Sequence, residues 1–297
     1  MRSVVNLLAA ACALGMVAAA HPVTAATAPS PYPPLNYRAM DKLGWKLCCQ
    51  AWTFREMTLF ETIDTIKKLG IRYIELYPGQ RFSPEQNVPF DHNSPQAMVD
   101  ALIKKLKAEH ITAMNYGVVG LGTNEAEDKK VFEFAKKLGL KTIVSEPDAA
   151  AIPMLDKLCR EYHMTIAIHD HPKPDYYWSP DVVLHTIAGA SDRIGACADT
   201  GHWYRSGLDP LECLKQLKGH IISLHFKDLS ANKMDAPWGT GVCDTAGMLN
   251  EMKAQGFKGV FSIEYESTSG AELVSNVEKC CQYFSAECTK LAAGKPA

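Results

Sequence analysis

Acidic and imidazole side chains end several short apolar runs in the second half of the chain. The runs are CADTGHW at 197–203, ISLHFKD at 222–228 and FSIEYE at 261–266. Each follows a segment with helical pattern, so Asp199, His225 and Glu264 come in succession at the ends of expected strands. Carboxylates and imidazoles are ligands of divalent metal ions, and their convergence predicts a metal site.

The segments that must position these residues repeat one unit: a helix end, a glycine and a buried strand. The closest copies are KKLGIRYIEL (67–76) and KKLGLKTIVSEP (136–147). Weaker copies and two further strands bring the total to eight, at 45–54, 67–76, 105–118, 136–147, 157–172, 192–203, 215–228 and 253–266. Apolar strands separated by single helices predict a parallel sheet covered by helices. Eight such units predict a (β/α)8 TIM barrel, α/β in class and a single domain.

An open, doubly wound sheet is the alternative fold. It would normally carry a glycine-rich phosphate loop after its first strand, and WTFREMTLF at 52–60 has no glycine. In a barrel all strands end at the same mouth. This would gather one set of polar residues around a single cavity, namely Glu75, Tyr116, Glu146, His169, His171, Asp199, His202, His225, Lys227 and Glu264.

The two carboxylates at 199 and 264 need a cation. Each follows apolar or small residues, and burying an unpaired carboxylate costs several kcal/mol. A metal ion or a salt-bridged Lys or Arg would both serve, and the convergence with His225 favours the metal. No thiolate stands at a strand end, so the set predicts one divalent ion, Mn²⁺, Mg²⁺, Co²⁺ or Zn²⁺, with open positions. Such an ion can bind adjacent sugar oxygens and stabilise an enediolate as a proton leaves carbon.

The three runs and PWGTGVCD at 237–244 resemble the xylose isomerase-like barrel superfamily. Its members include sugar isomerases and epimerases, inosose and dehydroshikimate dehydratases and apurinic endonucleases. The resemblance extends through nearly all of the chain beyond the N-terminal segment. It implies a metal held by Asp199, His225 and Glu264, with His202 contacting substrate and Trp238 over a sugar face.

The chain departs from this family on the fifth strand. Epimerases of the group have a glutamate there, as metal ligand and acid/base, whereas IAIHDHP at 166–172 has two histidines. We expect His171 to act as acid/base and His169 as ligand or orienting residue, with Glu146 as a neighbouring carboxylate that could complete the metal sphere. The expected catalytic residues are Glu264, His171 and Glu146, and the expected metal ligands are Glu146, His169, Asp199, His225 and Glu264. The expected substrate-binding residues are His202, Lys227, Trp238, Tyr116 and Glu75.

Two of these residues have a second interpretation. Glu75, in YIELYPG, could face the cavity or bond the backbone of the next loop. Lys227 alternates with His225 along its strand and could share its cavity, or it could be solvated and pair with Asp228.

Taken together, these features predict a metal-dependent sugar isomerase or epimerase that works through an enediolate. A lyase or hydratase that acts on 3-keto-glycosides or related keto-sugars by elimination is the alternative enzyme. A non-catalytic periplasmic sugar-binding protein is an alternative of another class. An endonuclease is disfavoured because the early histidine ligands are missing and the chain carries a formal net charge of −2, which also argues against any nucleic-acid partner.

The N-terminus predicts export, with a signal peptide at 1–25, a linker at 26–40 and the barrel at 41–297. Arg2 precedes an apolar run from Val4 to Ala20, and small residues follow. The mature protein would be periplasmic or secreted, with a carbohydrate as its partner and without stable membrane insertion; it could form oligomers. Cleavage would leave nine of the ten cysteines, an odd number, and most fit as small core residues.

Signal cleavage is directly testable. We expect the native protein to begin between about Ala20 and Ala26, because the small residues there suit signal peptidase. Intact-mass spectrometry of the protein from its native host measures this. A native protein that retains the segment from Met1 to Ala20 would contradict the expectation.

Overall fold

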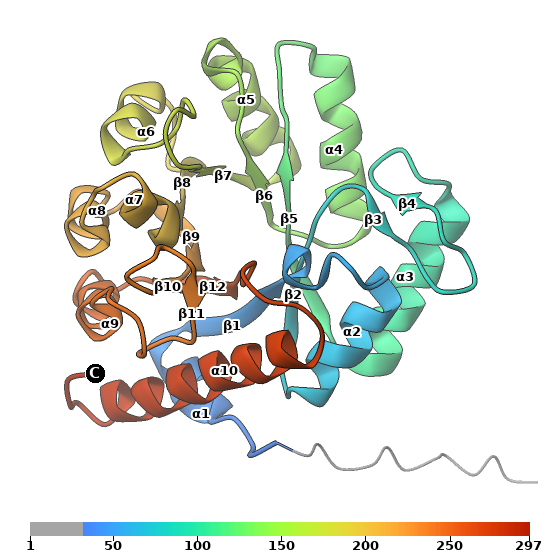
Figure 1. The fold of residues 1–297 in the computed structure, drawn as a ribbon. Helices are drawn as coiled ribbons and strands as arrows, with labels where there is room; N and C mark the ends of the chain where they lie inside the picture. The colour runs from blue at the N-terminus through green and yellow to red at the C-terminus, as the bar shows by residue number, and fades with distance from the viewer. Residues whose placement is uncertain (1–31) are drawn as a thin grey trace, which may run out of the picture.

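A closed barrel of eight parallel strands forms the centre of the computed structural model, which describes residues 32–297 (Figure 1). Around the barrel the strands are β1 (Trp45–Gln50), β12 (Gly259–Ile263), β9 (Ile221–Phe226), β8 (Ile194–Asp199), β7 (Thr165–His169), β6 (Thr142–Ser145), β5 (Thr112–Val119) and β2 (Tyr73–Leu76). The closure confirms the predicted (β/α)8 barrel and excludes the open sheet. Two short hairpins, β3–β4 (Gln80–Arg81, Pro89–Phe90) and β10–β11 (Asp228–Leu229, Asp235–Ala236), lie outside the barrel sheet.

Helices surround the barrel in the crossovers between strands (Figure 1). They are α2 (Leu59–Lys68), α3 (Gln96–Glu109), α4 (Glu125–Lys137), α5 (Ile152–Tyr162), α6 (Pro180–Thr186), α7 (Thr200–Arg205), α8 (Pro210–Gln216), α9 (Thr245–Ala254) and α10 (Gly270–Ala292), with short 3₁₀ turns η1 (Ala51–Phe54) and η2 (Ala149–Ala151). Helix α1 (Tyr37–Leu43) precedes the first strand and packs against α10. The crossover from β8 to β9 holds two helices, α7 and α8, and the first of them begins directly at the candidate site.

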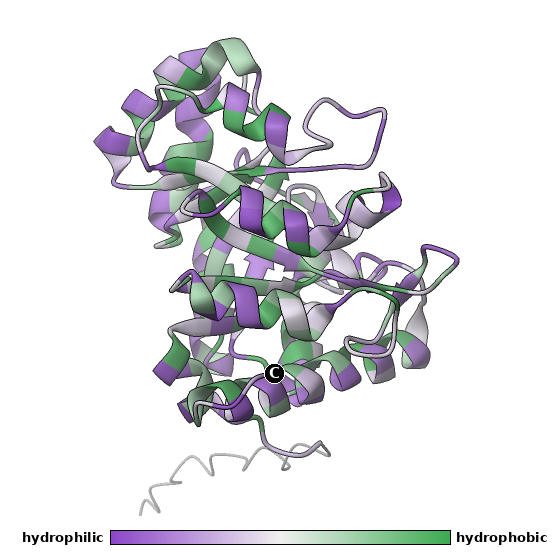
Figure 2. Cartoon of the chain, turned by 90° about the vertical axis from the view of Figure 1, so that its left-hand side faces the viewer, coloured by the Kyte–Doolittle hydropathy of each residue, from purple (hydrophilic) through white to green (hydrophobic). Residues whose placement is uncertain are grey.

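Local sequence accounts for where the helices begin and which face they bury. Thr58 and Glu61 form the predicted capping box of α2, and the buried Ile63 and Ile66 turn its apolar side inward. Pro180 opens α6 as expected. Hydrophobic and hydrophilic residues accordingly share the outer helices, as Figure 2 shows. The helices therefore cover the barrel and leave its strand ends to carry the site.

A small apolar cluster of Val144, Ala167 and Cys197, separate from the main core, joins three neighbouring strands. Side chains two residues apart on a strand share a face. His169 and Asp199 stand two residues beyond Ala167 and Cys197, at the ends of β7 and β8. The alternation of the strands thus carries these two side chains to the same mouth.

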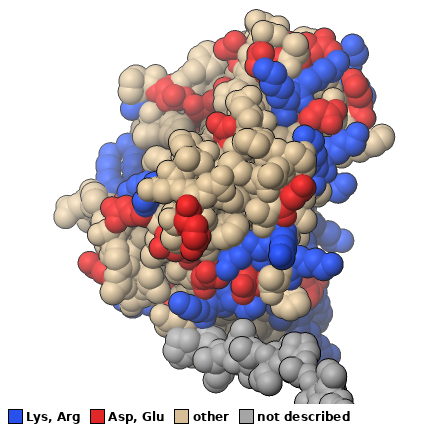
Figure 3. All heavy atoms as spheres, turned by 90° about the vertical axis from the view of Figure 1, so that its right-hand side faces the viewer, with Lys and Arg blue, Asp and Glu red and all other residues tan. Residues whose placement is uncertain are grey.

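The structure also bears on the expected linker, the cysteines, membrane spans and surface charge. Helix α1 takes in the last four residues of the segment expected as linker (26–40), and Met40 is fully buried; the expected signal peptide (1–25) lies outside the described residues. The nine cysteines of the described part are free and buried, which suits core roles. No helix within residues 32–297 is both long and apolar enough to cross a membrane. On the face shown in Figure 3, acidic and basic side chains lie interspersed.

Candidate active site

A cavity of about 280 Å³ lies where the strands end. Its lining residues are Gln50, Trp52, Tyr77, Pro78, Val118, His171, His202, Glu264 and Glu266. Three of these, His171, His202 and Glu264, are residues that the sequence assigned to the site. The lining residues lie on or just after β1, β2, β5, β7, β8 and β12, so strand ends from around the barrel meet at one small pocket, at the lower end of the usual size for ligand sites.

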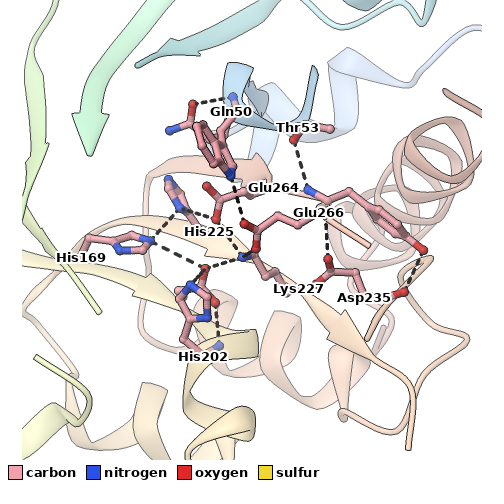
Figure 4. Close-up of polar contacts among 12 residues, drawn as sticks. Gln50, Thr53, His169, His202, His225, Lys227, Asp235, Glu264 and Glu266 are labelled. Atoms are coloured by element: carbon pink, nitrogen blue, oxygen red, sulfur yellow. Dashed lines mark hydrogen bonds and ion pairs between the residues drawn. The ribbon is translucent and has the colours of Figure 1, made fainter. Parts of the chain in front are cut away.

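His169, Asp199, His202 and Glu264 each place a potential metal-ligand atom within 4.8 Å of one another beside this cavity, and His225 adjoins His169 and Glu264 (Figure 4). His169 Nε2 lies 3.0 Å from His225 Nδ1, which lies 3.2 Å from Glu264 Oε2. His169 Nε2 also lies 3.7 Å from Asp199 Oδ2. A tetrahedral ion with bonds near 2.0–2.1 Å holds its ligands about 3.3 Å apart, so the spacing of these atoms fits a small divalent ion.

A hydrogen bond of its second ring nitrogen orients His225 for metal binding. Its Nε2 lies 2.8 Å from Glu75 Oε1, in the fully buried interior. The Glu75 carboxylate is itself fixed by hydrogen bonds from Gln50 Nε2, Asn115 Nδ2 and Ser262 Oγ. A hydrogen on Nε2 leaves a lone pair on Nδ1, and carboxylate–histidine pairs of this kind are typical behind metal ligands.

The two oxygens of the Asp199 carboxylate have different contacts. Its Oδ1 accepts the backbone N–H of His202 at 2.8 Å and so caps helix α7. Its Oδ2 is buried and lies 3.0 Å from the Lys227 ammonium and 3.7 Å from His169 Nε2. Burial alone would raise the pKa of Asp199, but the Lys227 ammonium and His169 hold it well below its usual range. The ionised oxygen is thus directed at the point where a cation would sit.

Lys227 is buried within the same cluster, and the Thr-Gly pair of ADTGHW explains how. Thr200 Oγ1 donates to the Lys227 carbonyl and accepts its backbone N–H, which binds α7 to this strand end. A Cβ on Gly201 would lie 2.9 Å from the Lys227 side chain, so only glycine permits this approach. The ammonium lies 3.0 Å from Asp199 Oδ2, 2.8 Å from Glu264 Oε2 and 2.8 Å from Glu266 Oε2.

The sequence left open whether a metal or a lysine offsets the buried carboxylates, and the structure shows that Lys227 supplies one positive charge. Within the described residues, Asp199, Glu264, Glu266 and Asp235 share ion pairs with Lys227 and Arg205, and Glu264 Oε2 also lies 3.2 Å from His225 Nδ1. A divalent ion at this site would therefore share the oxygens that Lys227 contacts.

A second pair of groups borders the cavity beside His169. Glu146 Oε1 forms a hydrogen bond with Nδ1 of His171 and lies 3.9 Å from Nδ1 of His169. Burial would raise the pKa of Glu146, but hydrogen bonds with the two histidines lower it to about 2. The carboxylate therefore orients His171 through Nδ1 and leaves Nε2 free to exchange a proton.

The family model described as xylose isomerase-like TIM barrel matches residues 63–282. The chain belongs to this family. It is 27% identical over 104 residues to an inosose dehydratase of Lacticaseibacillus casei; the match covers 35% of each protein, so the chain spans about a third of the length of that relative.

Two solved structures show the same fold. An uncharacterised protein of Parabacteroides distasonis ATCC 8503 is 33% identical, with a TM-score of 0.67 over 81% of this chain and 98% of its own. A D-psicose 3-epimerase, solved in the presence of D-fructose, has 12% identity and a TM-score of 0.63 over 84% of this chain and 99% of its own. The second likeness concerns the fold alone.

Four residues expected to bind substrate in this xylose isomerase-like barrel are not among the residues that line the cavity: Lys227, described above, and Glu75, Tyr116 and Trp238. Glu75 instead bonds His225. Its carboxylate neither lines the cavity nor bonds the backbone of the next loop. Tyr116 is fully buried, with its hydroxyl 3.0 Å from His92 Nδ1. Trp238 is only 3% exposed and packs edge-on against Phe226, with ring centroids 4.9 Å apart.

The inward position of Trp238 has a local cause. The carboxylate of Asp228 accepts backbone N–H groups from Gly239, Gly241 and Cys243. These bonds draw the loop onto the barrel and turn the indole into the core. Asp228 is therefore occupied with the loop, which explains why it does not pair with Lys227.

The sequence analysis did not single out Trp52, an aromatic residue that borders the cavity. Trp52 is 40% exposed, its ring lies edge-on to Tyr77 at 5.1 Å, and its Nε1 donates to Glu266 Oε1 at 3.1 Å. Glu266 stands two residues after Glu264, so strand alternation could have placed both carboxylates on one side. Trp52 has no such signal, because it lies in the 3₁₀ turn η1 after the first strand.

Glu75 offers a test of how the metal ligands are supported. We expect Glu75→Gln to weaken binding of Zn²⁺ or Mn²⁺ by about 10–100-fold, because it removes the charge that holds the Nε2 hydrogen of His225. Isothermal titration of the metal-free protein measures this. Glu272→Gln on α10 is the matched surface control, and an affinity equal to that of the wild type in both variants would contradict the role of Glu75.

Proposed function

We propose that this protein is a divalent-metal-dependent sugar isomerase or epimerase that acts through an enediolate on a sugar or keto-sugar. The observation that carries the proposal is the cavity itself. Glu264 and His171 reach it from the ends of strands β12 and β7, three strands apart around the barrel, and Glu146 bonds His171 from the end of β6. The cluster of His169, Asp199 and His225 lies on the strands between β12 and β6. Two acid/base groups on different sides of one bound sugar are what a proton transfer between carbons requires.

The residues that would hold the ion are His169, Asp199, His225 and Glu264. The buried Asp199 Oδ2, which faces both His169 and Lys227, and the distances that link His169, His225 and Glu264 support this set. A bound divalent ion would polarise adjacent sugar oxygens and stabilise the negative charge that develops when the proton leaves carbon.

The side chains of the cavity divide the remaining work. His171 Nε2 takes the proton from the carbon next to the carbonyl, while Glu146 holds the ring in place. In an isomerisation the same His171 gives the proton back to the neighbouring carbon. In an epimerisation a second proton, carried by Glu264, goes to the opposite face of the same carbon, and His171 keeps the first proton until it is released to solvent. Glu266 and the amide oxygen of Gln50 accept hydrogen bonds from sugar hydroxyls, and Trp52 and Tyr77 form an apolar wall.

A lyase or hydratase that acts on a keto-glycoside is the second candidate. The similarity to an inosose dehydratase favours it, together with histidine where the epimerases that the chain resembles have glutamate. In this reaction the proton leaves the carbon next to the keto group, the C–O bond to the leaving group breaks, and the leaving oxygen takes a proton. The same His171 could carry out the first step.

A deuterium-exchange screen tests both candidates. The purified protein with Mn²⁺ is incubated in D₂O with free sugars, keto-sugars and 3-keto-glycosides, and products are followed by NMR and mass spectrometry. Deuterium in an isomerised or epimerised sugar supports the first proposal, and release of the aglycone or water supports the second. Binding without exchange or release for every sugar would overturn both and favour a sugar-binding protein.

The metal has its own test. We expect the purified protein to bind about one divalent ion, and Asp199→Ala or His225→Ala to abolish binding because each deletes a ligand. Elemental analysis after incubation with Mn²⁺, Mg²⁺, Co²⁺ and Zn²⁺, followed by removal of free metal, measures this. Absence of metal from the wild type after all four incubations would contradict the site.

We also propose that the protein acts in the periplasm or outside the cell. The apolar N-terminal run followed by small residues supports export. Glycosides outside the cell would then be within its reach, and the mass measurement of the native N-terminus tests this.

A further inference from the structure

The guanidinium of Arg205 is held in one position beside the cavity. Its Nη2 donates to Asp235 Oδ1 at 2.8 Å, and its Nε donates to the Lys233 carbonyl at 3.2 Å. Asp235 is fixed in turn, because its Oδ2 accepts the backbone N–H of Glu266 and the hydroxyl of Ser267. The arginine therefore has little freedom to turn away from its neighbours.

The remaining arm of this arginine meets His202. Arg205 Nη1 lies 3.0 Å from His202 Nδ1, and the two residues stand three apart on helix α7, on the same side. Arginine has only donors and stays charged, so Nδ1 must be the acceptor in this hydrogen bond. An imidazole whose Nδ1 accepts is neutral and carries its hydrogen on Nε2.

The other nitrogen of His202 faces the candidate site. His202 lines the cavity, is 7% exposed, and its Nε2 lies 3.6 Å from Asp199 Oδ2, beyond hydrogen-bond distance. A metal ligand needs a lone pair on the ligating nitrogen, which an Nε2–H group lacks. This separates His202 from His169, Asp199 and Glu264, although all four place a ligand atom within 4.8 Å of one another.

We propose that Arg205 is a positioning residue that fixes His202 as its Nε2–H tautomer, and that His202 is thereby a hydrogen-bond donor to a substrate oxygen rather than a metal ligand. The oxygen would be a carbonyl or a hydroxyl next to the carbon that loses its proton. The role at substrate rests on the proposed function, whereas the tautomer does not.

The cavity presents mainly hydrogen-bond acceptors, so a donor to a substrate oxygen has a role there. The carboxylates of Glu264 and Glu266 line it as acceptors, and Lys227 is already bound by three carboxylates. An oxygen that gains negative charge needs a donor, and a neutral imidazole N–H supplies one without giving up its proton. Removal of one such donor costs about 10²–10³ in kcat in well-studied cases.

The first experiment reads the tautomer in the metal-free protein. Wild-type protein with ¹⁵N-labelled histidine is studied by long-range ¹H–¹⁵N NMR, with His202→Gln used to assign the signals. We expect protonated Nε2 and unprotonated Nδ1 in His202, and in Arg205→Met a loss of this fixed state. Protonated Nδ1 in the wild type would overturn the proposal, even if Arg205→Met failed to fold.

Two further readouts separate positioning from general support of the fold. Addition of Zn²⁺ should shift the ring signals of His169 and His225 and leave the Nε2 hydrogen of His202 in place; its loss would show that His202 is a ligand. With a substrate from the exchange screen, Arg205→Met should lower kcat at least about 10-fold, and Arg205→Lys, which can still donate to Nδ1, should recover part of it. Equal losses in both variants with an unchanged tautomer would overturn the positioning role. Failure of every substrate with the expected NMR result would instead count against the proposed function alone.

Discussion

Replacement of His171 by glutamine is expected to lower kcat about 10²-fold or more while the protein stays folded and keeps its metal. Glutamine can still form hydrogen bonds, but it cannot take a proton from carbon. His171 is 43% exposed in its side chain, bonds Glu146 and packs against the ring of His169 with centroids 4.7 Å apart, but it is not one of the four proposed ligands, so its replacement should leave metal binding intact. Steady-state kinetics and metal content, measured on the same preparation, give the result.

The interpretation depends on which kinetic constant changes. If His171 only bound substrate, KM would rise and kcat would change little. His185→Gln is the matched control, because His185 is exposed on helix α6 and distant in sequence from the strand ends. Near-normal kcat in His171→Gln would assign the proton transfer to Glu264 and Glu146 instead.

The fold followed from the sequence because each repeat carries its own signals. The glycine after several helices, such as Gly70 and Gly139, the continuous apolar strands and the capping box at Thr58 are local features, and all are present in the structure. Parallel strands that share one mouth then bring their end residues together by topology alone. This is why Asp199, His225 and Glu264 could be grouped without any structure.

The errors arose where a side chain could face two ways. Glu75 ends a strand like the other candidates, but four buried donors, among them Gln50 and Ser262, make it a support for His225. Trp238 lies in a loop whose path depends on Asp228 and on three backbone N–H groups. Contacts between segments of different crossovers leave no periodic pattern in the sequence.

The sequence alone could not predict the tautomer of His202 or the ion pairs of Lys227 either. From the sequence, Lys227 could share the cavity of His225 or lie in solvent. Its packing against Gly201 and its ion pair with Asp199 show that it lies within the site. Arg205 was not singled out, although it stands three residues after His202 on one helix. That spacing is common on exposed helices, so it gains meaning only from the fixed hydrogen bonds of the guanidinium.

Lys227→Met is expected to destabilise the metal-free protein by about 3–5 kcal/mol, since it leaves the buried Asp199 and Glu264 and the half-buried Glu266 without their ammonium. Burial would lower the pKa of Lys227, but these carboxylates raise it well above its usual range, so the group that is lost is a full positive charge. Urea unfolding in the presence of EDTA measures the difference. Lys215→Met, which removes an exposed pair with Glu212, is the control and should change stability by less than about 1 kcal/mol.

The same variant shows whether Lys227 and a metal ion share their oxygens. Lys227 contacts Asp199 Oδ2 and Glu264 Oε2, two of the four atoms whose spacing fits an ion. A ligand that binds only the folded state adds stability in proportion to the logarithm of its concentration over Kd. Without the competing ammonium, Zn²⁺ or Mn²⁺ should bind more tightly, so the gain on adding metal should be larger in Lys227→Met than in the wild type. An equal gain in both proteins would mean that the ion, if bound, uses other oxygens, and an unchanged stability in EDTA would mean that the carboxylates do not depend on the lysine.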